Sequence, residues 1–251
     1  MRTDIKEKIC LALDVEAFDE AKKLVDDLAP YVGVFKVGLQ LYTAFGNEII
    51  EYIRGRNANF FLDIKLMDIP NTVQKASENV VLRGANFFNV HCLGGLEMMK
   101  AAVKGARSTG RNPTILGVTI LTSISQDVFD NELHIKHNVS DYAIELAKLA
   151  KKAGLTGVVA SPHELKRIKE ACGKDFKVLC PGIRPKWSAA DDQKRIATPE
   201  ETLKNGADYI VLGRAVTAAG SSNCRSVTSA QGLNGPIAAM ERIYEDIKND
   251  H

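Results

Sequence analysis

Eight short apolar runs recur along this chain of 251 residues, and longer amphipathic stretches separate them. Each run is too short for a helix and rich in Val, Ile, Leu and Phe, which is typical of parallel strands covered on both faces. The runs are 9–15, 33–39, 59–66, 86–92, 114–121, 157–161, 176–183 and 208–216. Eight strand–helix repeats in a chain of this length predict a (β/α)8 barrel.

The stretches between the runs have the apolar spacing of helices. In 140–154, Ser140 is expected to cap the start of the helix, and Gly154 is expected to end it in a left-handed conformation. Pro162 suits the first turn of another helix. Further helices are expected at 46–56, 70–84 and 161–173.

An open, doubly wound sheet is the alternative architecture. Eight repeats favour the barrel, and so does the absence of a Gly-rich phosphate-binding pattern after the first run. The composition does not shift along the chain, so we expect one domain over 1–251. Two polar segments interrupt the rhythm: 184–199, and the Ser- and Gly-rich 220–235, which we interpret as a surface insertion.

Composition limits the partners. A formal net charge of +2 argues against nucleic acid or an anionic membrane as the main partner. No apolar run approaches the roughly 18 residues of a transmembrane helix, and the first residues lack the apolar core of a signal peptide. The five cysteines contain no C-x-x-C pair, which fits a reducing compartment better than disulfides or zinc. We therefore expect a cytoplasmic protein.

Polar residues stand at nearly every strand end. The active site of a (β/α)8 barrel lies at the C-terminal ends of its strands, so these residues are candidates for function. They are Asp14, Lys36, Asp63, Lys65, Asp68, His91, Thr122, Ser123, Ser161, Arg184, Gly213 and Arg214.

The third run continues as "FLDIKLMDIPNT", residues 61–72, and carries charges that a barrel strand would otherwise exclude. Asp63 and Lys65 are two positions apart, so on a strand their side chains point the same way. Unpaired charges there would cost several kcal/mol each. With Lys36 and Asp68 the charges sum to zero, so the four can neutralise one another. A lysine fixed beside a carboxylate suits proton delivery.

A phosphate site is expected after the eighth run. The motif "VLGR" offers the backbone N–H of Gly213 and the guanidinium of Arg214 at the usual phosphate position of this fold. The alternative is that Arg214 is an ordinary surface residue. The 184–199 loop could fold over the ligand, with Gln193 donating to the same phosphate.

Five motifs, in order along residues 8–219, carry a family resemblance: "LALDV", "FKVGLQL", "LDIKLMDIPNT", "PGIR" and "VLGR". They resemble orotidine 5'-monophosphate decarboxylases of the short bacterial form. The resemblance implies conversion of orotidine 5'-monophosphate to uridine 5'-monophosphate, the last step of de novo pyrimidine nucleotide synthesis, by a homodimer without cofactor or metal. The segment 220–235 departs from the family, which usually enters the last helix sooner.

The resemblance also implies a role for each motif residue. Lys65 would protonate C6 of the pyrimidine, and Asp63 would lie against the departing carboxylate. Lys36 and Asp68 would complete the charge network, with Asp68 serving the partner's site. Contacts to the rest of the nucleotide would come from Asp14 and Thr72 near the ribose, Thr122 and Ser123 near the base, and Arg184, Gln193, Gly213 and Arg214 at the phosphate.

Two other functions remain open. Sugar-phosphate decarboxylases and aldolases of the same superfamily, such as 3-keto-gulonate 6-phosphate decarboxylase, share D-x-K-x-x-D but bind magnesium through an acidic residue on the second strand, where this chain has Lys36. A non-catalytic nucleotide-binding barrel would need the phosphate and ribose residues but not the four charges. His134 and His137 are a weak metal signal, and Trp187 is assigned no binding role.

Overall fold

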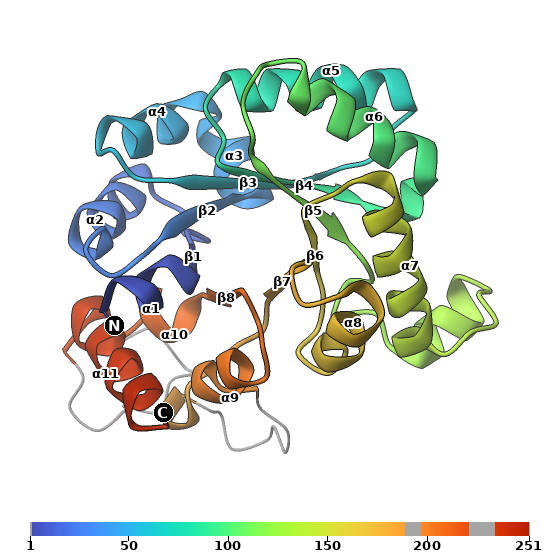
Figure 1. Ribbon diagram of the computed structural model, residues 1–251. Coiled ribbons are helices and arrows are strands. Elements are labelled where there is room, and N and C mark those ends of the chain that lie inside the picture. Colours follow the sequence, from blue (N-terminus) through green and yellow to red (C-terminus); the bar gives the residue numbers. More distant parts are fainter. Residues whose placement is uncertain (1, 189–196, 221–233, 251) are drawn as a thin grey trace. The chain divides into compact units, whose positions relative to one another are not determined.

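The computed structural model describes residues 2–188, 197–220 and 234–250 (Figure 1). Eight strands, hydrogen-bonded in chain order, form a closed barrel, which confirms the predicted (β/α)8 fold and excludes the open sheet. The strands are β1 (Ile9–Ala12), β2 (Val34–Gly38), β3 (Phe60–Leu66), β4 (Phe87–His91), β5 (Thr114–Val118), β6 (Gly157–Val159), β7 (Lys177–Cys180) and β8 (Tyr209–Leu212). Each strand lies inside one of the eight apolar runs.

The chain divides into two compact units, and the first comprises residues 1–61 and 182–251. In it β1 pairs in parallel with β2 and with β8, and Cys10 lies opposite both Val34 and Val211. Helix α11 packs on α2 and α9. The helices of this unit are α1 (Arg2–Lys8), α2 (Phe18–Leu28), α3 (Leu39–Phe45), α4 (Asn47–Gly55), η3 (Lys186–Ser188), α9 (Pro199–Lys204), α10 (Arg214–Thr217) and α11 (Pro236–Asn249).

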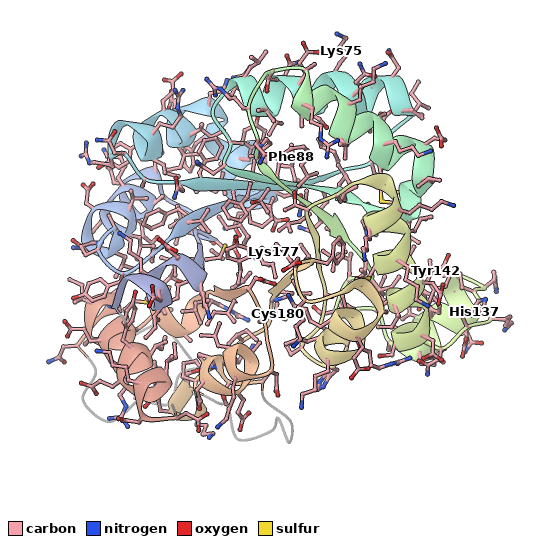
Figure 2. The ribbon with its side chains drawn as sticks, viewed as in Figure 1. Lys75, Phe88, His137, Tyr142, Lys177 and Cys180 are labelled. Atoms are coloured by element: carbon pink, nitrogen blue, oxygen red, sulfur yellow. The ribbon has the colours of Figure 1, made fainter. Side chains whose placement is uncertain are left out.

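The second unit comprises residues 62–181. Strands β4, β5, β6 and β7 pair in parallel in that order, and the helices from α5 to α8 pack each on the next. Phe88 of β4 is among the largest fully buried side chains (Figure 2). The helices of this unit are α5 (Pro70–Leu82), η1 (Cys92–Gly94), α6 (Gly95–Arg107), η2 (Val128–Glu132), α7 (Val139–Ala153) and α8 (Leu165–Cys172).

Two expected helix starts were wrong. Asn138, not Ser140, caps α7: its side-chain oxygen accepts the backbone N–H groups of Ser140 and Asp141 at 3.0 and 3.2 Å. Asn caps helices at least as well as Ser, so the earlier of two good candidates took the position. Helix α8 begins only at Leu165, and Pro162 lies in the turn before it. The end of α7 was correct, because Gly154 adopts φ 87°.

None of the helices within the described ranges is long and apolar enough to cross a membrane.

Close packing of α5 on α6 depends on Gly105, because a Cβ there would lie 2.0 Å from the backbone oxygen of Gln74. We expect Gly105→Ala to lower the free energy of unfolding by about 1–3 kcal/mol, the usual cost of overpacking. Gly55→Ala is the matched control, since Gly55 ends α4 with open space around it. That change should leave stability within about 1 kcal/mol of wild type, or raise it. Urea unfolding would measure both, and equal effects would contradict the packing argument.

Candidate active site

Three side chains of the second unit meet at the end of β3. The Lys65 ammonium lies 2.7 Å from Asp63 Oδ1, and the Asn89 side-chain amide donates to the same oxygen at 2.7 Å. Only 13% of the Asp63 side chain is exposed, against 30% for Lys65, and Asn89 is buried. The structure thus pairs Asp63 with Lys65, as the spacing predicted.

Lys65 does not have strand geometry, however. Its φ is +52°, in the left-handed region that non-glycine residues seldom adopt. Its backbone N–H donates at 2.8 Å to the side-chain oxygen of Asn89, on the neighbouring strand β4. The alternation rule therefore does not explain the pair by itself: the strand turns out of regular geometry at Lys65, and the long side chain reaches back to Asp63.

Asn89 was missed by the sequence analysis. The signal was present, because an amide stands between Phe88 and Val90 inside the apolar run "NFFNVHC". A buried amide needs hydrogen-bond partners, and the charged residues of the neighbouring strand β3 are candidates. An Asn in such a strand could therefore have been flagged as a partner of the charged pair.

Asp68 and Thr72 follow β3 and are exposed. Asp68 Oδ1 accepts the backbone N–H of Ile69 at 2.6 Å, just before α5. Its apolar neighbours are unusually open to solvent: Met67 is 55% exposed and Ile69 is 67% exposed. Asp68 thus stands on an apolar surface rather than in the Asp63–Lys65 pair.

Of the four residues in the predicted charge network, Lys36 belongs to the first unit. Lys36 is buried in β2, and its ammonium lies 3.2 Å from Asp14 Oδ1, just beyond β1. Gly38 makes room for this pair: a Cβ there would lie 2.9 Å from Lys36 Nζ and 3.1 Å from Asp14 Oδ1. The ion partner of Lys36 in the structure is therefore Asp14, the residue expected to bind the ribose.

The predicted phosphate residues also belong to the first unit. Gly213 immediately follows β8, and the exposed Arg214 begins the short helix α10. Arg184 follows β7 and is half-buried, and its backbone N–H donates to the carbonyl of Ala197 at 3.1 Å. Gln193 lies outside the described residues, as does most of 220–235.

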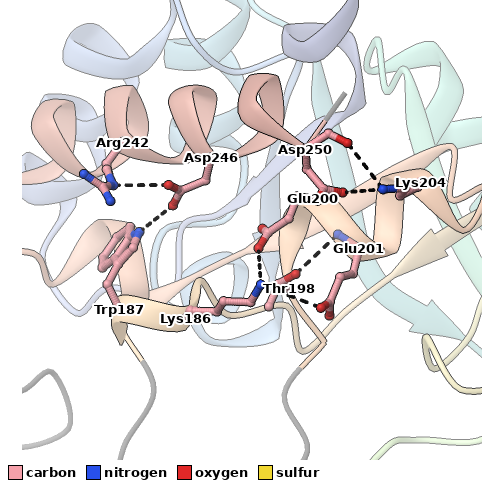
Figure 3. Close-up of polar contacts among 9 residues, drawn as sticks. All are labelled: Lys186, Trp187, Thr198, Glu200, Glu201, Lys204, Arg242, Asp246 and Asp250. Atoms are coloured by element: carbon pink, nitrogen blue, oxygen red, sulfur yellow. Dashed lines mark hydrogen bonds and ion pairs between the residues drawn. The ribbon is translucent and has the colours of Figure 1, made fainter.

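The residues on either side of 189–196 are fixed to helices of the same unit (Figure 3). The indole N–H of Trp187 donates to Asp246 of α11 at 2.9 Å, and Asp246 also accepts from Arg242 at 3.2 Å. On the other side, the Thr198 hydroxyl caps α9 by accepting the N–H of Glu201. Trp187 therefore has a structural role in anchoring this part of the chain.

His91 ends β4 close to Lys65. Its Nδ1 accepts the backbone N–H of Leu93 at 3.4 Å, so in the neutral ring the proton is on Nε2. Burial, and then the charge of Lys65, hold the pKa of His91 below its usual value. His91 is thus kept neutral beside the ammonium.

Thr122 and Ser123 are exposed in the segment that follows β5. In the next part of this segment His137 contacts the ring of Tyr142, with ring centroids 5.6 Å apart (Figure 2). Across the described ranges, no group of three His, Cys, Asp or Glu side chains is placed to hold a metal ion. Cys10, Cys92, Cys172 and Cys180 are buried and form no disulfide among the described residues, and burial raises the pKa of Cys92 to about 12.

Comparison with known proteins decides the family. Residues 7–226 match the Orotidine 5'-phosphate decarboxylase / HUMPS family. The chain belongs to this family. It is 48% identical over 221 residues to an orotidine 5'-phosphate decarboxylase of Geotalea daltonii, covering 87% of this chain and 92% of that protein. An equivalent protein of Heliobacterium modesticaldum is 44% identical over 223 residues, covering 87% and 92%.

A solved structure agrees with these sequence relatives. Orotidine 5'-phosphate decarboxylase from Lactobacillus acidophilus superposes with a TM-score of 0.78 at 33% identity, covering 95% of this chain and 98% of that one. The match extends over nearly all of both chains, so the orotidine 5'-phosphate decarboxylase / HUMPS family accounts for the whole barrel.

The neutral state of His91 makes stability depend on pH. Because its pKa is lowered on folding, the unfolded chain binds more protons below about pH 6.5, and the contribution of His91 is lost as pH falls through that value. We expect the free energy of unfolding of wild type, measured relative to that of His91→Gln, to decrease as the pH is lowered from about 7.5 to about 5.5. Urea unfolding at several pH values would measure it. A difference that stays constant or grows towards acid would contradict the assignment.

Proposed function

We propose that this protein is a carboxy-lyase that converts orotidine 5'-monophosphate to uridine 5'-monophosphate and carbon dioxide in pyrimidine nucleotide synthesis. The observation that carries the proposal is the Lys65 ammonium, held 2.7 Å from the Asp63 carboxylate at the end of β3. Family membership and the curated relatives support the same reaction.

The reaction needs a proton source and preorganised charge. When the bond between C6 and the carboxylate breaks, its electron pair stays on C6, and the proton that replaces carbon dioxide comes from the Lys65 ammonium. The same positive charge stabilises the developing carbanion. Asp63 would face the departing carboxylate and hold the Lys65 ammonium in position. The protein thus supplies from its own side chains what a cofactor supplies in other decarboxylases.

Binding of the non-reacting part of the substrate would fall to the first unit. We assign the phosphate to Arg184, Gly213 and Arg214, with Gln193, and the ribose hydroxyls to Asp14. Arg214 is exposed and begins α10, where a phosphate could reach both its guanidinium and backbone N–H groups. Binding energy gained there can be used to orient the pyrimidine. The contacts of Thr72, Thr122 and Ser123 with the nucleotide stay predictions.

The sugar-phosphate alternative fits the chain less well. That reading requires an acidic metal ligand on the second strand, and Lys36 occupies this position in ion-pair contact with Asp14. A buried ammonium would repel a divalent cation.

Turnover of orotidine 5'-monophosphate by the purified protein with excess EDTA tests this proposal, followed by ultraviolet absorbance. We expect turnover in wild type and a loss of about 10²–10⁴-fold in kcat for Lys65→Ala, the usual contribution of a positioned acid. Lys75→Ala is the matched control, because Lys75 pairs with Glu78 on the surface of α5 (Figure 2). It should keep wild-type activity.

Three outcomes would count against this function. A wild type that does not turn over orotidine 5'-monophosphate but turns over sugar phosphates with magnesium would support the alternative reaction. Near-normal turnover by Lys65→Ala would remove the assigned acid. Binding of the nucleotide without any turnover would favour the non-catalytic barrel.

We further propose that the protein is a homodimer in which Asp68 completes the partner's site. Met67 and Ile69 support this, because both flank Asp68 and expose more than half of their apolar side chains. Apolar groups so exposed around a charged residue are typical of a surface that a partner covers. A cytoplasmic location, expected from the sequence, remains a prediction.

Mixed dimers would test the role of Asp68. Lys65→Ala and Asp68→Asn should each be nearly inactive alone. When a one-to-one mixture is unfolded and refolded, about half of the dimers contain one subunit of each variant. If Asp68 serves the partner, one of the two sites in each mixed dimer has both Lys65 and Asp68. About a quarter of wild-type activity should therefore return. No recovery, with dimers formed, would place Asp68 in the site of its own subunit.

A further inference from the structure

Asn89 links the backbone N–H of Lys65 to the ammonium of the same residue through a closed set of contacts. Its amide oxygen accepts the backbone N–H of Lys65 at 2.8 Å, and its amide nitrogen donates to Asp63 Oδ1 at 2.7 Å. Asp63 Oδ1 in turn lies 2.7 Å from the Lys65 ammonium. One buried side chain therefore fixes the backbone of Lys65 directly and its ammonium through Asp63.

The chemistry of the two partners requires an amide. A backbone N–H needs an acceptor, whereas a carboxylate needs a donor, and the amide supplies both from one planar group. This also fixes which amide atom faces which partner. A Ser or Thr hydroxyl could supply both functions only from a single oxygen, and an Asp could supply only acceptors when ionised.

The backbone of Lys65 gives Asn89 a second task. At φ +52° this residue is in a conformation that costs free energy, and such conformations persist only where the surroundings hold them. The bond from Asn89 meets the N–H of that strained residue. Without it the backbone at Lys65 could relax towards regular strand geometry and carry the ammonium away from Asp63.

We propose that Asn89 is a positioning residue for the decarboxylation: it holds Lys65 in its left-handed conformation and Asp63 against the Lys65 ammonium, so that the proton donor is in place before the substrate reacts. This inference rests on the function proposed above. Asn89 itself does not take part in proton transfer and acts only through its two partners. Its contribution should therefore appear in the chemical step more than in substrate binding.

Asn89→Ala and Asn89→Asp test the inference in two different ways. Asn89→Ala removes both bonds, and we expect kcat to fall about 10- to 100-fold with a much smaller change in KM, since misplacement by about 1 Å can cost 10²-fold. Asn89→Asp preserves shape and the acceptor for Lys65, but places a second carboxylate against Asp63. Two carboxylates in direct contact share a proton. The pH profile of kcat should therefore gain an ionisation that wild type lacks.

Thr156→Val is the matched control. The Thr156 hydroxyl oxygen accepts the backbone N–H of Ile115 at 3.1 Å, just before β6 and at the opposite end of that strand from the catalytic residues. This variant removes the same kind of bond, from a side chain to a strand N–H, in the same unit. Its kcat and pH profile should match wild type even where thermal unfolding shows a loss of stability.

The possible results separate this inference from the proposed function. An active wild type with kcat of Asn89→Ala within about threefold of it would overturn the positioning role alone. So would a pH profile of Asn89→Asp that superimposes on that of wild type, or a loss in Thr156→Val as large as in Asn89→Ala. A wild type without turnover of orotidine 5'-monophosphate would overturn both.

Discussion

Charges on the strands of a barrel must be neutralised where they stand, because neither face of such a strand meets bulk water. This constraint links the fold to the site. Lys36 is buried yet lies 3.2 Å from Asp14, and Asp63 is mostly buried yet lies 2.7 Å from Lys65. In each pair the more buried member, Lys36 or Asp63, would lose charge compensation if its partner were removed, which is costly for a desolvated group. The two buried charges thus have ion partners of opposite sign, and each pair holds an ammonium in a defined place.

The fold could be predicted because its signal is repeated eight times. Each strand reads as an apolar run, and an error in one run would not have changed the architecture. Details at helix ends were less secure, because they depend on one hydrogen bond among several similar ones. Asn138 and Ser140 are both good caps within three residues, and sequence alone does not say which will accept the free N–H groups of α7.

The candidate site could be predicted in its residue types but not in its conformation. The spacing of Asp63 and Lys65 predicted a pair, and the pair is present. Its geometry could not be derived from strand alternation, because Lys65 adopts φ +52° and leaves that geometry. The cause lies on another strand, in the amide of Asn89. Contacts between strands depend on register, which a single sequence does not specify, so the side chain that holds the lysine was interpreted as part of an apolar run.

Strand β4 then has a larger part in the site than its apolar sequence suggests. At one position it presents an amide that holds Lys65 and Asp63, and two residues later it presents His91. Burial and the charge of Lys65 keep that imidazole neutral, by lowering its pKa. A protonated His91 would place a second cation near Lys65. Strand β3 thus supplies the charges, and β4 keeps their number and arrangement fixed, which is what catalysis by preorganised charge requires.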